Sequence, residues 1–191
     1  YRDADGGTWS GAAYIFRIDY KQHAKLVAGD AASSDQFGNS VSISGDYAIV
    51  GASNDADGGT QSGAAYIFIR SGTSWSQQAK LVAGDAAAGD YFGYSVSISG
   101  DHAVVGAYLD DAHNWKLNTG SAYTFVRDGT SWSQNAKLVA DDAAGSDNFG
   151  NSVSISGDYA LVGAHYDDDG GGASGSAYIF IRDGTSWSQQ A

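Results

Sequence analysis

The chain repeats one short unit along its whole length. The string Gly-Ala-Ala-Tyr-Ile-Phe recurs with at most two changes, and its copies lie at 11–16, 63–68, 120–125 and 175–180. The string Phe-Gly-Asn-Ser-Val-Ser-Ile-Ser-Gly-Asp also recurs, at 37–46, 92–101 and 149–158. A period of roughly 40–55 residues built only from strand-like patterns is typical of a propeller blade. The sequence therefore predicts about three and a half copies of one all-β unit.

Each complete unit contains four predicted strands. In the copy at 37–83, residues 37–44 alternate large with small side chains, and residues 47–52 are apolar on both faces. Residues 64–70 and 75–82 form the third and fourth predicted strands. Glycine-containing turns follow the first and third strands, and no helical periodicity is present. The unit is therefore predicted to be a four-stranded antiparallel blade.

We expect a single repeat domain over 1–191, folded as an all-β propeller or propeller-like array. Its predicted parts are a half blade with a connecting loop (1–36), two blades (37–91 and 92–148) and a blade with a truncated last strand (149–191). One blade cannot bury its faces alone, and open strand edges invite pairing. We therefore expect either further blades outside this sequence or chains that complete one another.

Composition excludes several classes of function. The chain has no cysteine, so disulfides and thiolate metal sites are excluded. The net charge of −12 disfavours nucleic acid and anionic membranes as partners. No apolar stretch reaches the about 18 residues that a membrane-spanning helix needs. The abundance of Gly, Ser and Asp fits a turn-rich secreted β protein, so an extracellular or cell-surface location is expected.

All 22 acidic residues are aspartates, and they gather in two kinds of loop. One kind joins the second and third strands, and its members are the candidate metal ligands Asp3, Asp5, Asp55, Asp57, Asp110, Asp111, Asp167, Asp168 and Asp169. The other kind leads into each blade and contains Asp30, Asp35, Asp85, Asp90, Asp141, Asp142 and Asp147. In a four-stranded blade both kinds of loop leave from the same rim, so we expect the two sets to lie together.

The pattern Asp-x-Asp-Gly-Gly at 3–7 and 55–59 resembles the opening of a calcium-binding loop. Calcium is a hard cation that takes oxygen ligands, and a glycine permits the sharp turn. The alternative is that these aspartates are solvated residues that form turns. The sequence leaves both interpretations open.

Departures from the repeat mark a second candidate surface. Trp9 stands where the next unit has Gln61, and His113 and Trp115 lie in a longer loop at 110–118. An exposed tryptophan beside polar groups can stack on a sugar or anchor a partner. The alternative is packing of this loop on a neighbouring chain. Trp75, Trp132 and Trp187 repeat in register, which indicates a place in the packing between blades or on the blade surface.

No catalytic constellation is recognisable. The sequence has no glutamate for an acid–base pair, no serine–histidine–aspartate order and no phosphate-binding glycine loop. The sequence therefore favours a protein that is not an enzyme.

The recurring Phe-Gly and Gly-Ala pairs resemble the FG-GAP repeat family. They are Phe37-Gly38 with Gly51-Ala52, Phe92-Gly93 with Gly106-Ala107, and Phe149-Gly150 with Gly163-Ala164. The family is known from the propeller of integrin α subunits and from bacterial surface proteins. In the integrin type a calcium loop joins the first two strands; here that connection is only a tight turn such as Ser44-Gly45-Asp46, so those metal sites do not carry over.

The resemblance and the composition together predict a non-enzymatic extracellular module for adhesion or self-assembly, with Ca²⁺ ordering its acidic loops. Its expected partner is another copy of the chain or another surface protein. The alternative function is that of a carbohydrate-binding propeller, with a glycan as partner.

Overall fold

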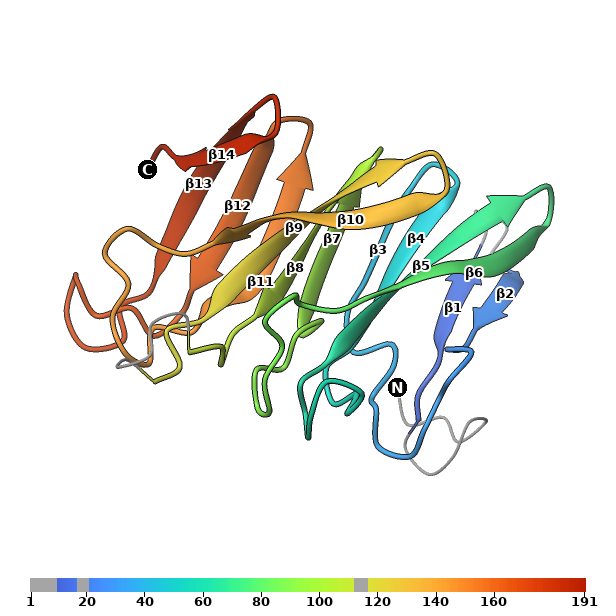
Figure 1. The fold of residues 1–191 in the computed structure, drawn as a ribbon, viewed down its shortest axis with the longest axis horizontal. Coiled ribbons are helices and arrows are strands. Elements are labelled where there is room, and N and C mark those ends of the chain that lie inside the picture. The colour runs from blue at the N-terminus through green and yellow to red at the C-terminus, as the bar shows by residue number, and fades with distance from the viewer. Residues whose placement is uncertain (1–9, 17–20, 112–116) are drawn as a thin grey trace.

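A computed structural model describes residues 10–16, 21–111 and 117–191 (Figure 1). These residues form strands and no helix, so the all-β prediction is confirmed for the described part of the chain. It follows that no described helix could cross a membrane.

The strands form one two-stranded sheet and three four-stranded sheets, each an antiparallel meander. The half blade contains β1 (Ala13–Phe16) and β2 (Gln22–Leu26). Blade 1 contains β3 (Val41–Ser44), β4 (Tyr47–Ala52), β5 (Ala64–Ser71) and β6 (Ser74–Leu81). Blade 2 contains β7 (Ser95–Ser99), β8 (His102–Ala107), β9 (Ser121–Asp128) and β10 (Ser131–Leu138). Blade 3 contains β11 (Phe149–Ser156), β12 (Tyr159–Ala164), β13 (Ser176–Asp183) and β14 (Ser186–Gln189).

The sheets stand side by side along the array, each packed on the next (Figure 1). The inner strands of blades 1 and 2 are buried on both faces because each of these two sheets lies between two neighbouring sheets. Three clusters of buried side chains fill the three junctions. Between blades 1 and 2, for example, Ile49 and Ile67 meet Phe92 and Ile98. This stacking is the propeller-like arrangement that the repeat predicts.

A phenylalanine at the start of each complete blade is the anchor of its junction. Phe37, Phe92 and Phe149 are completely buried. Each ring packs edge-on against a tyrosine and a second phenylalanine of its own blade; for Phe92 these are Tyr123 and Phe125, at centroid distances of 5.5 and 6.0 Å. Such edge-to-face pairs are favourable because the ring edge is positive and the ring face is negative.

The backbones of successive blades touch at the Gly-Ala pairs. A Cβ atom on Gly51 would lie 1.9 Å from the carbonyl oxygen of Gly93, and one on Gly106 would lie 2.0 Å from that of Gly150. Neither Gly51 nor Gly106 has a positive φ, so the constraint is the space that the next blade leaves. The Gly-Ala pair is therefore a contact point between blades.

Serine hydroxyls complete this junction. The Ser40 Oγ donates to the Gly93 carbonyl at 2.8 Å, and the Ser42 Oγ accepts from the Ile98 N–H at 3.2 Å. Blade 2 repeats the pattern toward blade 3, where Ser95 donates to Gly150 and Ser97 accepts from Ile155. The small-residue face of each first strand thus hydrogen-bonds the first strand of the next blade.

Substitution of Gly106 tests this junction. We expect Gly106→Ala to lower the free energy of unfolding by about 3 kcal/mol or more, because the added methyl group meets backbone that cannot move aside. Gly100→Ala is the control: its φ is +57° but no atom lies within 4 Å of the added carbon, so only the backbone cost of about 1 kcal/mol applies. Urea unfolding of both variants measures the difference. Equal losses would contradict the contact.

Candidate functional site

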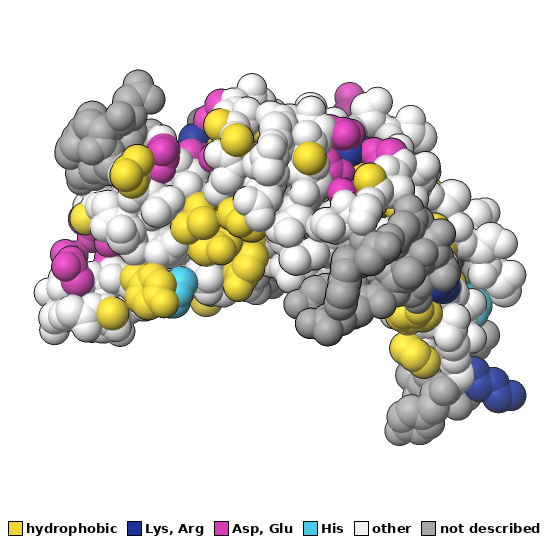
Figure 2. Space-filling view, turned by 90° about the horizontal axis from the view of Figure 1, so that it is seen from below, with side chains coloured by type: hydrophobic (Ala, Val, Ile, Leu, Met, Phe, Trp, Pro, Cys, Tyr) yellow, Lys and Arg dark blue, Asp and Glu magenta, His cyan; other side chains and the backbone are white. Residues whose placement is uncertain are grey.

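Aspartates from two separate loops meet at one rim of the array, as the sequence predicts. Carboxylate oxygens of Asp30, Asp55 and Asp57 lie within 4.8 Å of one another. Asp30 comes from the loop that enters blade 1, whereas Asp55 and Asp57 come from the loop between β4 and β5. Figure 2 looks onto the loop side of the molecule and shows acidic side chains spread along it.

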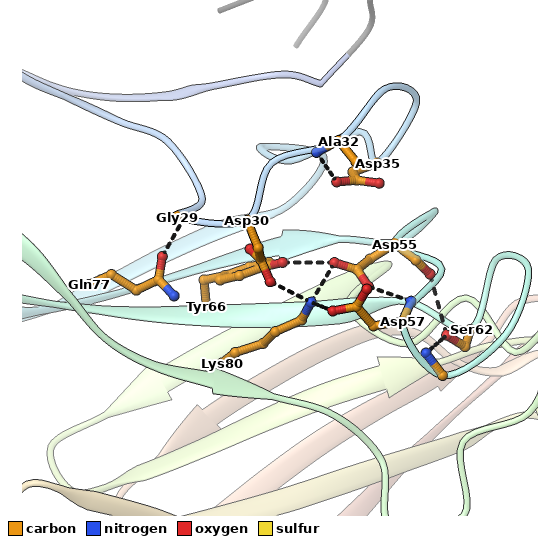
Figure 3. A network of polar contacts seen from close by, with 11 residues as sticks. Gly29, Asp30, Ala32, Asp35, Asp55, Asp57, Ser62, Tyr66, Gln77 and Lys80 are labelled. Carbon is orange, nitrogen blue, oxygen red and sulfur yellow. Dashed lines mark hydrogen bonds and ion pairs between the residues drawn. The ribbon is translucent and has the colours of Figure 1, made fainter. Parts of the chain in front are cut away.

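The ammonium group of Lys80, on β6, stands among these three carboxylates (Figure 3). Its Nζ lies 2.8 Å from an oxygen of Asp30, 2.9 Å from one of Asp55 and 2.5 Å from one of Asp57. The Tyr66 hydroxyl donates to Asp55 at 2.7 Å. We call this group, Asp30, Asp55, Asp57, Tyr66 and Lys80, the blade 1 cluster. A lysine occupies the position between the carboxylates that a metal ion would need.

A β-bulge brings Lys80 to this position. Tyr66 pairs directly with Lys80 and Phe68 with Gln77, so β6 carries one extra residue, Gln78, between the two pairs. The bulge changes which residues of β6 share a face. It also frees Gln78 to accept the indole N–H of Trp132 from blade 2, at 2.9 Å. The repeated tryptophans therefore pack between blades, which is one of the two places that the sequence predicts.

The electrostatics keep Lys80 and Asp30 charged. Burial alone would lower the pKa of Lys80, but hydrogen bonds to its three carboxylates outweigh it and hold that pKa above the usual range. Burial would raise the pKa of Asp30, but hydrogen bonds from Lys80 and Tyr66 hold it below the usual range. The contribution of Asp30 to stability is thus present above its unfolded-state pKa and is lost as pH falls through its lowered pKa.

Blade 2 contains a smaller version of the same cluster. The Lys137 Nζ lies 2.7 Å from an oxygen of Asp85 and 2.7 Å from one of Asp110. The Tyr123 hydroxyl donates to both carboxylates. Asp111 does not share these contacts; its carboxylate accepts the Asn118 N–H within its own loop, at 2.7 Å.

In blade 3 the carboxylates accept hydrogen bonds from hydroxyl groups. Asp167 accepts from the hydroxyls of Tyr178 and Ser176, at 2.7 and 2.9 Å. The charge of Asp167, followed by that of Asp142, raises the pKa of Asp169, and Asp168 adds to the effect.

Other aspartates form turns, which is the alternative that the sequence left open for them. Asp35, Asp90 and Asp147 each accept a backbone N–H three residues earlier in the chain, at 2.7, 2.7 and 2.5 Å. Burial raises the pKa of Asp90 to about 6, and the Asp110 charge adds to this effect. Asp55 belongs to the blade 1 cluster and also forms a turn, because its carboxylate accepts the Asp57 N–H at 3.0 Å.

Several sequence candidates lie outside the described residues: Asp3, Asp5, Trp9, His113 and Trp115. The sequence analysis missed Lys80 and Lys137, although they recur in register with Lys25. It also missed Arg127 and Arg182, which pair with the hairpin aspartates Asp101 and Asp158. The sequence did contain a signal for these residues: lysine and arginine recur at equivalent positions of the repeat, as the aspartates do.

The cluster carboxylates are engaged by lysine and tyrosine and are not arranged around a nucleophile. What this rim offers chemically is charge and hydrogen-bonding surface.

The FG-GAP repeat family model matches the chain three times, at 20–68, 75–125 and 132–180. Each matched segment runs from the last strand of one sheet to the third strand of the next, and so contains both kinds of acidic loop. A search of curated proteins finds no match. The matches confirm the resemblance inferred from the Phe-Gly and Gly-Ala pairs.

Replacement of Lys80 tests the clusters. We expect Lys80→Gln to lower the free energy of unfolding by about 2 kcal/mol, because Asp55, only 3% exposed, loses its counter-charge. We do not expect the full free-energy cost of breaking a buried ion pair, because the carboxylates of Asp30 and Asp57 are exposed to solvent. Arg70→Gln is the control, since Arg70 and Asp46 form an exposed pair worth at most about 1 kcal/mol. Thermal unfolding distinguishes the two; similar small losses would contradict a stabilising role for Lys80.

Proposed function

Because the chain belongs to the FG-GAP repeat family, we propose that it is a non-enzymatic extracellular module for adhesion or self-assembly, in a surface, matrix or filament protein. FG-GAP repeats occur in adhesion and extracellular proteins, and the family is generally non-enzymatic. The expected partner is a further blade of the same type, from another copy of the chain.

The observation that carries this proposal is the outer face of blade 3. In blades 1 and 2 the corresponding faces are covered by the next sheet, and Ile49 and Ile67 are completely buried. Their counterparts in blade 3, Leu161 and Ile179, are 45% and 39% exposed. With Ser154, Ser156 and Tyr159 they line a shallow hollow. This face has the side chains of a blade junction.

The half blade presents the complementary surface. Its Tyr14 and Phe16 are 44% and 63% exposed, whereas their counterparts in blade 2, Tyr123 and Phe125, are buried against blade 1. Head-to-tail association would place Tyr14 and Phe16 on the face of Leu161 and Ile179. The contact would reproduce the junction found twice inside the chain, and such heterologous contacts generate rings or filaments.

An unfilled position beside β1 adds a second contact. The space between β1 and the strands β3 and β4 is lined by Tyr14, Phe16, Val41 and Ile43. Val41 and Ile43 are exposed, whereas their counterparts in blade 2, Val96 and Ile98, are buried. In complete blades this is the position of the first two strands, and among the described residues no strand pairs with that edge of β1. Strands from another chain would complete the half blade.

Sedimentation velocity tests the assembly. We expect the wild-type chain to form larger species as its concentration rises, and Leu161→Lys to remain a monomer because it places a charge in an apolar junction. Leu117→Lys is the control, since Leu117 is 70% exposed on a loop away from this face. A wild-type chain that stays monomeric, or a Leu161→Lys variant that associates like the control, would refute head-to-tail assembly.

Calcium belongs to this proposal at blade 3. In blade 3 Asp142 and Asp167 repel Asp169, and a hard cation with oxygen ligands would relieve that repulsion. Calcium bound here would order the loops beside the assembly face.

Thermal unfolding with added Ca²⁺ tests this part. We expect Ca²⁺ to raise the melting temperature of the wild-type chain, since a ligand at about 100 times its Kd stabilises the folded state by about 2.7 kcal/mol. The rise should be lost in Asp167→Asn and retained in Asp57→Asn. Ca²⁺ without effect on the wild type, or an equal effect on both variants, would contradict calcium binding at blade 3.

A further inference from the structure

At three positions on the loop side, blade 2 has a tyrosine where the other complete blades have a different residue. Tyr91 stands where the other blades have Gln36 and Asn148. Tyr94 corresponds to Asn39 and Asn151, and Tyr108 corresponds to Ser53 and His165. Tyr91 and Tyr94 lie in the segment that leads into blade 2, and Tyr108 follows β8. The repeat gives no packing reason for any of the three.

The three rings form one cluster. The centroids of Tyr94 and Tyr108 lie 4.3 Å apart, and those of Tyr91 and Tyr108 lie 5.7 Å apart, with the rings tilted by 45° and 48°. All three side chains are half-buried and none belongs to a buried core cluster. Figure 2 shows hydrophobic side chains gathered near the middle of this face. We call these three residues the tyrosine platform.

The hydroxyls of the tyrosine platform differ from those of the core tyrosines. Tyr66 and Tyr123 are completely buried, and their hydroxyls donate to aspartates. The described hydrogen bonds include none made by the hydroxyls of the platform. Half-exposed rings that carry hydroxyls at their edges suit a ligand that is apolar on one side and polar at its edge.

Neighbouring blades fix the backbone of the platform. Asn39 of blade 1 donates to the carbonyl of Tyr94 at 3.1 Å, and Asn148 donates to that of Tyr108 at 3.2 Å. Tyr91 has a φ of +56°, and the equivalent Gln36 and Asn148 have φ of +58° and +59°. The left-handed backbone therefore belongs to the repeat, and the cost specific to blade 2 is that of a bulky side chain in it. A strained aromatic residue that adds nothing to the core is a reason to look for a binding role.

The size and charge of the surface define the ligand. Three half-buried rings offer far less than the about 800 Å² per partner of a standard protein interface, which favours a small ligand over a folded protein. The net charge of −12 disfavours an anion. Rings in mutual contact leave no room between them for a cation. We propose that the tyrosine platform binds a neutral saccharide, whose C–H face stacks on the rings while its hydroxyls meet the tyrosine hydroxyls.

Calorimetric titration with neutral oligosaccharides (maltohexaose, cellohexaose and chitohexaose), and with heparin as the anionic comparison, tests this site. We expect the wild-type chain to bind at least one neutral oligosaccharide and to bind none of the heparin. The triple variant Tyr91→Gln, Tyr94→Asn, Tyr108→Ser takes the residues of blade 1, so it should fold. Its binding should be at least about tenfold weaker, because each lost ring removes a stacking contact.

Two controls separate this site from assembly. Tyr159→His replaces an exposed tyrosine with the residue of blade 2, His102, and should leave saccharide binding unchanged. Leu161→Lys should also retain it, since the tyrosine platform does not depend on head-to-tail association. No binding of a neutral saccharide by the wild-type chain, tighter binding of heparin, or equal binding by the triple variant would overturn the proposal. Loss of self-association in the triple variant would instead assign the platform to a protein contact.

Discussion

The close approach of backbones between successive blades is the constraint on which the rest of this structure depends. At Gly51 and Gly106 the next blade leaves no space for a side chain. That approach carries the adjacent Phe-Gly pair into the junction, where the ring of Phe92 or Phe149 is completely buried. The recurring Phe-Gly and Gly-Ala pairs are therefore two halves of one contact, repeated down the array.

The same stacking brings the acidic loops together, so their negative charges must be compensated by other side chains. The blade 1 cluster joins a loop that precedes the blade, a loop within it and its last strand, through Asp30, Asp55 and Lys80. In this blade the ammonium group of Lys80 therefore neutralises the aspartates, as a bound cation does in other acidic loops. Three carboxylates surround Lys80, whereas two contact Lys137. A rim built from nearly identical repeats thus differs from blade to blade in its electrostatics.

Much of the fold could be predicted from the sequence, because period-2 alternation and turn glycines specify strands directly. The strand at 47–52 was predicted with the bounds of β4, and the meeting of Asp30 with Asp55 followed from topology alone. The position of Lys80 could not be predicted, since the bulge at Gln78 changes the alternation along β6. The tyrosine platform could not be predicted for another reason: Tyr108 comes from a different segment than Tyr91 and Tyr94, and only the fold brings its ring into contact with theirs.

Native-state hydrogen exchange tests most directly whether the blades form one cooperative unit. The amides of Phe92 and Phe149 donate to carbonyls of the preceding blade, each at 2.9 Å. If blades cannot stand alone, these amides exchange only by global unfolding, with the same opening free energy as the Ile67 amide inside blade 1. Exchange of the Phe149 amide at a clearly lower free energy, with blade 1 still protected, would show that blades open independently and would contradict the account.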